Sequence, residues 1–148
     1  MNLFDVCTSD LVILKASATV AEAARLMRDR HVGCVIVFGD TLPRRPVGII
    51  TDRDIVIKVV ADEQKNASAT IRDVMSTKLL VSPGTTGIYE AVTLMTERGL
   101  RRLLVMDDAG HPKGIVSFDD LLRFIAKEQN TMAPAIASGL LREENRRG

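Results

Sequence analysis

The sequence has little cysteine and little histidine. Of its 148 residues, two are cysteines, Cys7 and Cys34, and two are histidines, His31 and His111. Two distant cysteines cannot staple a domain of this size and match no metal-ligand spacing, which argues against a disulfide scaffold and a structural zinc site. Cys34 falls in an apolar run, which favours a buried, inert thiol over a nucleophile. We therefore expect a protein of the reducing cytoplasm.

Long apolar runs and an excess of one charge are also missing. No apolar run approaches the roughly 20 residues that cross a bilayer, and residues 1–5 lack the basic start and apolar stretch of a secretory signal. Twenty basic residues against 19 acidic ones leave a net charge of +1. No strong field then attracts nucleic acid or an anionic membrane, and we expect neither as a partner. The remaining balance, 46% hydrophobic and 26% charged residues, is typical of a globular domain.

What the sequence does contain is an internal repeat. Residues 20–30 match residues 88–98 at an offset of 68, and residues 48–55 match residues 114–121 at an offset of 66. The difference of two residues falls in the polar stretch 39–46, where a surface turn tolerates it. Two matching blocks in the same order make chance unlikely. The identical pairs of the first block are Glu22/Glu90, Ala23/Ala91, Leu26/Leu94, Met27/Met95 and Arg30/Arg98.

Each copy has the pattern strand, helix, strand, strand, helix. Apolar residues at helical spacing follow Thr19, and Thr19 with Glu22 forms a capping box; Gly87 is a weaker cap in the second copy. Two apolar runs separated by turn residues then predict a hairpin. Neither copy is large enough for a robust core alone, so we expect the two to pack on each other in an α+β fold. The predicted strands and closing helix are 11–14, 34–38, 47–50 and 52–60 in the first copy, and 79–81, 103–106, 114–116 and 118–127 in the second.

These elements divide the chain into four parts. We assign residues 8–62 to the first repeat, 63–70 to a polar linker, 71–128 to the second repeat and 129–148 to a C-terminal helical tail. In the tail, Met132, Ile136 and Leu140 recur every four residues. An apolar stripe of this kind is costly to leave in water, which predicts that the tail covers the module or a second copy.

One motif occurs at the same place in both copies. Gly48-Ile-Ile-Thr51-x-x-Asp54 and Gly114-Ile-Val-Ser117-x-x-Asp120 both span the end of a strand and the start of a helix. The plain interpretation is a helix cap, with the hydroxyl on a backbone N–H and the acid near the positive end of the helix dipole. The functional interpretation uses the same groups. A helix N-terminus binds phosphate, the hydroxyl donates to it, the carboxylate accepts from ribose hydroxyls, and the glycines allow a close approach.

The repeat and its paired motif resemble tandem cystathionine-β-synthase (CBS) domain proteins, in which the pair is known as a Bateman module. The resemblance covers roughly residues 8–128 and is to the small free-standing bacterial members. It implies two β-α-β-β-α repeats packed sheet to sheet around a pseudo-two-fold axis. It also implies two clefts that bind adenosine-containing ligands such as AMP, ADP, ATP, S-adenosylmethionine or NAD(H), and usually a dimer of modules.

The resemblance also assigns residues to the clefts. It places Thr51 and Asp54 in the first cleft and Ser117 and Asp120 in the second. The segments 14–19 and 82–87, with Thr19 and Ser82, would meet the base. The start of the second strand of each copy would supply further wall, through Cys34 and Val35 in one and Arg102 and Leu103 in the other.

The two clefts are expected to differ in charge. Arg53 beside Asp54 is positioned to meet a phosphate, whereas the second copy has Phe118-Asp119 at the matching positions. The first cleft is therefore expected to hold phosphate more tightly, unless Arg101 or Arg102 supplies the missing charge. These two arginines are adjacent on a strand, so their side chains point to opposite faces.

The function this predicts is regulatory. We expect a module without catalytic residues and without a catalytic cofactor, which binds an adenine nucleotide and signals through a change in packing to an effector protein. No nucleophile, general base or metal constellation supports an enzyme. The alternatives are a dimerising scaffold with unoccupied clefts, or a sensor of S-adenosylmethionine or NAD(H).

Overall fold

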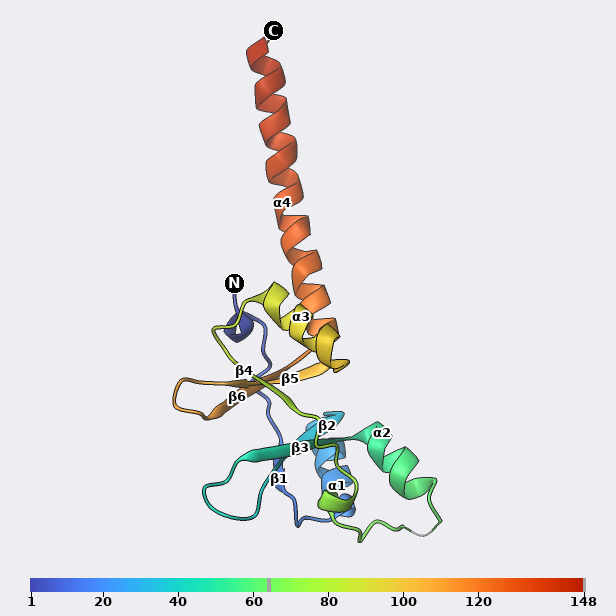
Figure 1. The fold of residues 1–148 in the computed structure, drawn as a ribbon. Helices are drawn as coiled ribbons and strands as arrows, with labels where there is room; N and C mark the ends of the chain where they lie inside the picture. Colours follow the sequence, from blue (N-terminus) through green and yellow to red (C-terminus); the bar gives the residue numbers. More distant parts are fainter. Residues whose placement is uncertain (64, 148) are drawn as a thin grey trace.

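The computed structural model describes residues 1–63 and 65–147, and the side chains of all of these except 140, 141 and 143–147. It contains two similar units, each a sheet with helices on one face (Figure 1). The first unit comprises β1(Ile13–Lys15), α1(Val20–Arg30), β2(Cys34–Phe38), β3(Pro46–Thr51) and α2(Asp52–Ile55), which continues as the π-helical segment η2(Val56–Val60). The second comprises β4(Leu80–Pro83), α3(Ile88–Arg98), β5(Arg102–Met106), β6(Pro112–Ser117) and α4(Phe118–Arg147). The predicted order of elements is confirmed in both copies.

The two sheets have the same topology. The strand order is β1-β2-β3 in one and β4-β5-β6 in the other, with the first pair parallel and the second antiparallel. Cys34 pairs with Thr51 at one end of the first sheet, and Lys15 pairs with Phe38 at the other. The matching pair in the second sheet is Arg102 with Ser117. The register therefore sets both motif hydroxyls beside the starts of β2 and β5.

Helix α1 begins and ends where the sequence predicts. The Thr19 hydroxyl accepts a hydrogen bond from the Glu22 N–H, and the Glu22 carboxylate accepts one from the Thr19 N–H. His31 ends the helix in the left-handed conformation, with φ of 53°, and Gly99 does the same for α3 with φ of 62°. Gly87 begins α3 without a side-chain cap, as predicted.

Strand alternation divides the apolar residues among three layers. Val35 and Val37 on β2 face the helices, whereas Ile36 and Phe38 face the other sheet. The central layer, made by Ile36, Phe38, Ile49 and Leu104, packs the sheets face to face. The helix-facing cores of the two units are separate, and Met27 and Met95 are buried in them, as expected.

The segment before each repeat packs against the other repeat. The short 3₁₀ helix η1(Leu3–Asp5) contributes Leu3 to the core of the second unit, and η3(Ile71–Asp73) contributes Ile71 to that of the first. Thr8 and Ile115 exchange backbone hydrogen bonds, as do Ser76 and Ile49. Residues 3–8 and 71–76 are therefore also equivalent, at the offset of 68. The predicted first repeat begins at residue 8, so the packing of residues 3–8 on the second repeat was not predicted.

Helix α4 does not stop at the predicted end of the second repeat. It runs without interruption through Pro134 to Arg147, so the expected tail is a continuation of the closing helix. Figure 1 shows this part projecting away from both sheets. Met132 and Ile136 are 55% and 65% exposed, while the side chain of Leu140 lies outside the described residues. Among the helices of the described residues, none is long and apolar enough to cross a membrane.

Candidate functional site

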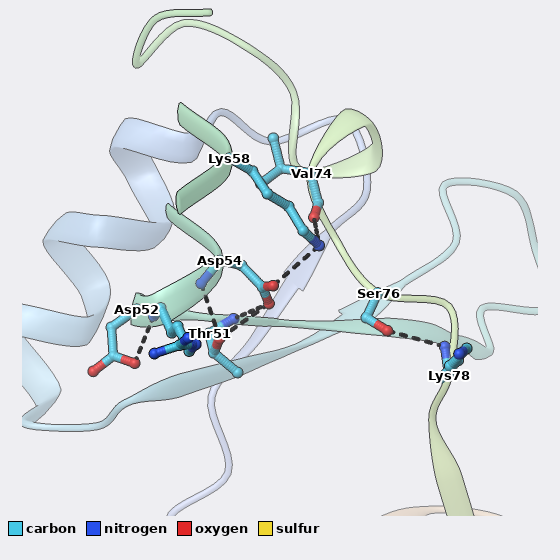
Figure 2. A network of polar contacts seen from close by, with 8 residues as sticks. Thr51, Asp52, Asp54, Lys58, Val74, Ser76 and Lys78 are labelled. Carbon is cyan, nitrogen blue, oxygen red and sulfur yellow. Dashed lines mark hydrogen bonds and ion pairs between the residues drawn. The ribbon is translucent and has the colours of Figure 1, made fainter. Parts of the chain in front are cut away.

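The first motif forms a capping box at the junction of β3 and α2. The Asp54 Oδ2 atom accepts hydrogen bonds from the Thr51 N–H and from Thr51 Oγ1, both at 3.0 Å. The Asp54 N–H donates to Thr51 Oγ1 at 3.1 Å. Figure 2 shows these contacts at the end of β3. These contacts agree with the plain interpretation of the motif as a helix cap.

The second motif has the same geometry at the start of α4. Asp120 Oδ2 accepts from the Ser117 N–H at 2.9 Å and from Ser117 Oγ at 2.6 Å, and the Asp120 N–H donates to Ser117 Oγ at 3.1 Å. The other carboxylate oxygen, Oδ1, lies 3.8 Å from Nη1 of Arg123, whose side chain is 81% exposed. Capping thus uses one oxygen of Asp120 and leaves the second available to a ligand.

A cleft of about 560 Å³ opens beside Ser117 and Asp120. Its opposite wall comes from the first repeat. The segment leading into β1 and the turn between α1 and β2 both contribute, so the cleft is composite. Its lining residues are Thr8, Asp10, Leu11, Val12, His31, Val32, Gly33, Cys34, Ile36, Arg102, Ile115, Ser117, Asp120 and Arg123.

Cationic side chains lie at this composite cleft. Arg102 lines it, whereas the neighbouring Arg101 pairs with Asp119 at 3.0 Å, so the two arginines diverge as predicted. Burial raises the pKa of the Cys34 thiol, although the nearby Arg102 acts to lower it. The raised pKa keeps this thiol protonated at neutral pH. The acid Asp10 also lines the cleft, but its carboxylate pairs with Arg30 at 2.6 Å. With Arg102 and Arg123 near the N-terminus of a long helix, the cleft can hold an anionic group, and these arginines supply the charge that the second motif lacks.

The first motif has a different partner. Lys58 Nζ lies 3.0 Å from Asp54 Oδ1 and donates a hydrogen bond of 3.0 Å to the carbonyl oxygen of Val74 (Figure 2). Burial acts to raise the pKa of Asp54, but the hydrogen bonds from Lys58 and Thr51 outweigh it and hold this pKa below its usual value. Both oxygens of Asp54 are therefore engaged within the chain.

Several predicted site residues lie elsewhere. Val35 and Leu103 are completely buried among the helix-facing residues, so their side chains reach no cleft, and the expectation that they form cleft wall is corrected. Thr19 caps α1, and Ser82 is buried and bonded to Thr86 Oγ1 at 2.7 Å. Neither lines the composite cleft, because both lie toward the strand ends away from Thr51 and Ser117.

Arg53 is exposed beside Asp52, Val56 and Ile57 in a shallow recess on α2 and η2. The glycines of the motif have a structural role. A Cβ on Gly114 would lie 2.5 Å from the carbonyl oxygen of Thr8, and one on Gly48 would lie 2.6 Å from that of Ser76. These glycines therefore allow the backbone of the segments 3–8 and 71–76 to lie close to β6 and β3.

Sequence reasoning missed the segment 8–12 and Arg123. It also paired Cys34 with Thr51 and Asp54 in one cleft, whereas Cys34 lines the cleft of Ser117 and Asp120. The available signal was the equivalence of residues 3–8 with 71–76, which marks a further repeated element ahead of each first strand. Which repeat that element packs on is a tertiary property.

Comparison with known proteins identifies the family. The model of the CBS domain matches residues 3–61 and 71–127. The protein YlbB of Bacillus subtilis is 33% identical over 145 residues, covering 96% of this chain and 93% of its own. The protein MK0525 of Methanopyrus kandleri is 35% identical over 123 residues, which are 83% of this chain and 62% of that protein, so this chain spans less than two thirds of that relative. The chain belongs to the CBS domain family.

Solved structures show the same fold. The CBS domain protein TA0289 of Thermoplasma acidophilum superposes with a TM-score of 0.71 at 27% identity, over 84% of this chain and 68% of its own. PAE2072 of Pyrobaculum aerophilum, a CBS domain protein complexed with AMP, superposes with a TM-score of 0.72 at 21% identity, over 86% and 99%. The tandem repeat packed sheet to sheet is therefore the fold of a CBS domain pair.

Proposed function

We propose that the protein is a non-catalytic regulatory module of the cytoplasm that binds an adenosine-containing ligand of the AMP, ADP or ATP class. The observation that carries this proposal is the composite cleft. Ser117 and Asp120 come from one repeat and Thr8–Val12 with Gly33 and Cys34 from the other, so one ligand contacts both repeats. A ligand held in this way biases how the repeats pack, provided that its affinity differs between two packing states. An effector protein would read that change.

The chemistry of the cleft fits a nucleoside phosphate. The Oδ1 atom of Asp120, which has only the exposed Arg123 as a charged neighbour at 3.8 Å, would accept hydrogen bonds from ribose hydroxyls. Ser117, Arg102 and the start of α4 would face the phosphate. The partly exposed apolar side chains of Leu11 and Ile115 form a surface for the base. Two proteins of this fold were crystallised with adenosine compounds, PAE2072 with AMP and MJ0100 with 5′-methylthioadenosine and S-adenosylmethionine, which adds support for this ligand class.

The test is a thermal-shift and calorimetry panel with AMP, ADP, ATP, S-adenosylmethionine, NADH and adenine. We expect at least one phosphate-bearing adenosine compound to raise the melting temperature, and adenine alone to have no effect because it lacks ribose and phosphate. S-adenosylmethionine as the tightest binder would move the proposal to a sulfonium sensor. A protein that responds to no compound would instead be a scaffold with unoccupied clefts.

We further propose that the protein is a homodimer held together in part by α4 beyond residue 128. In this part of the helix the side chains of Met132 and Ile136 are exposed. A small recess between α3 and α4 lies beside Met132, and two further exposed side chains, Tyr89 and Met1, line it. Most of the stability of a helix in a protein comes from packing of its apolar face, so a partner is expected to cover this one.

Removal of residues 129–148 is expected to convert a dimer into a monomer, measured as molar mass by light scattering. The double variant Met132→Glu/Ile136→Glu should act in the same direction without shortening the chain. The matched control is Thr131→Glu, which adds charge to the same helix turn off the apolar stripe. A full-length monomer, or a dimer that survives both changes, would contradict the role of α4.

A further inference from the structure

The two repeats differ at one position one turn beyond the motif aspartate. Lys58 in the first repeat corresponds to Phe124 in the second, at the offset of 66 that aligns Asp54 with Asp120. Phe124 packs against the core of its repeat. The Lys58 side chain instead returns along η2 toward the motif, and its amine lies between Asp54 and Val74 (Figure 2).

This amine changes what Asp54 can accept. Asp54 Oδ2 takes two hydrogen bonds from Thr51, and Oδ1 takes the ammonium group of Lys58 at 3.0 Å. In the second repeat Oδ2 of Asp120 is used in the same way, but Oδ1 has Arg123 at 3.8 Å as its charged neighbour. Asp54 is 19% exposed and Lys58 41%, so the pair is partly shielded from water, whereas Arg123 extends into solvent.

The contact with Val74 makes the lysine more than a surface partner. Val74 follows η3, in the exchanged segment that packs on the first repeat, and its side chain is buried in that core. Lys58 therefore joins the motif carboxylate to the segment equivalent to the one that lines the composite cleft. A ribose arriving at Asp54 would have to displace an ammonium group that has two partners.

The helices behind the two motifs differ as well. Helix α2 has four residues before the backbone changes to the π-helical segment η2, whereas α4 continues for 30 residues. The peptide groups of η2 continue along the direction of α2, and a helix terminus acts mainly through its first turn, so the Lys58 contact and not helix length separates the two motifs.

From this asymmetry we propose that Lys58 acts as an internal cation that closes the Thr51–Asp54 motif to ligand. The module then binds one adenosine ligand per chain, in the composite cleft at Ser117 and Asp120. This inference rests on the proposed function, and it reverses the expectation that Arg53 makes the first cleft the tighter site. It assigns to Lys58 the control of how many sites the repeat pair offers.

The test is the stoichiometry of AMP and ATP binding, measured by calorimetry on the wild type and on Lys58→Met. Methionine keeps an unbranched side chain of similar length and removes the ammonium group, so packing along η2 is retained. We expect one equivalent per chain for the wild type and a second equivalent for Lys58→Met. Adding Asp54→Asn to Lys58→Met should abolish the second equivalent and leave the first.

Two controls separate this role from a general effect of charge. Lys58→Arg keeps a cation at the position and should stay at one equivalent. Lys127→Met removes an exposed lysine from α4 and should also leave one. A melting curve of each ligand-free variant shows whether it is folded, and Lys58→Gln provides a second neutral variant if methionine destabilises the protein.

The outcomes distinguish the two proposals. Two equivalents for the wild type, one for Lys58→Met, or weaker binding in Lys58→Met would each overturn the role of Lys58 while the proposed function stands. The last of these would make Lys58 a ligand contact. If neither AMP nor ATP binds the wild type or the variant, the proposed function fails and this inference falls with it.

Discussion

Replacing Gly114 with alanine is expected to lower the free energy of unfolding by about 2 kcal/mol or more, the range of overpacked interiors. The added Cβ would lie 2.5 Å from the carbonyl oxygen of Thr8 and 3.0 Å from the Cys7 Sγ atom. The oxygen belongs to backbone that exchanges hydrogen bonds with Ile115, so it cannot move away without weakening the contact between the repeats. For a chain of this size the change corresponds to roughly 4–8 °C in melting temperature.

The matched control is Gly87→Ala, where an added Cβ meets nothing within 4 Å. It should leave the melting temperature within about 1–2 °C, since it removes no contact. Gly48→Ala is expected to behave like Gly114→Ala, because its Cβ would lie 2.6 Å from the carbonyl oxygen of Ser76. Equal melting temperatures for Gly114→Ala and Gly87→Ala would show that the exchanged segments do not pack as described.

Replacing Asp120 with asparagine is expected to remove most of the response to nucleotide. The variant retains an acceptor for Ser117 but loses the charge, and it presents a donor where a ribose hydroxyl needs an acceptor. Loss of charge-assisted hydrogen bonds worth about 1.5–3 kcal/mol each weakens binding at least about tenfold. In the wild type, ligand at about 100 times its dissociation constant adds roughly 2.7 kcal/mol to the stability of the folded state. At roughly 2–4 °C per kcal/mol, that is a shift of about 5–10 °C.

Asp54→Asn is the control for this prediction, because it makes the same change in the motif that Lys58 engages. It should keep the nucleotide response of the wild type while lowering the melting temperature of the ligand-free protein, since Lys58 loses its charged partner. A variant at Asp54 that loses the response, with Asp120→Asn unaffected, would exchange the roles of the two motifs.

The order of the elements was predictable because it depends on local pattern. Thr19 with Glu22 begins α1, and the alternation along β2 separates helix-facing valines from sheet-facing residues. That alternation also corrects the expected site. Cys34 and Val35 cannot both line one cleft, since neighbouring side chains on a strand point to opposite faces, and the same holds for Arg102 and Leu103. Strand alternation is visible in the sequence, but the family resemblance by itself implies that both neighbours of each pair form cleft wall.

The composition of the cleft was not predictable from the repeat. Sequence gives two equivalent motifs, but the segment 8–12 reaches Ser117 through packing between the repeats. The exchange of Leu3 and Ile71 between the two cores is likewise set by tertiary contacts. The proposed closing of the Asp54 motif depends on the position of the flexible Lys58 side chain, which tertiary contacts with Asp54 and Val74 determine. The uninterrupted course of α4 through Pro134 also exceeds what helical periodicity predicted.

The most direct test of the central claim is a crystal structure of the protein with AMP or ATP, at a concentration where calorimetry shows saturation. The account predicts ribose hydroxyls on Asp120, phosphate facing Ser117 and Arg102, and the base between residues of both repeats, with Cys34 in the wall. A ligand held by residues of one repeat alone, or a cleft at Asp120 that stays empty while nucleotide binds elsewhere on the chain, would contradict it.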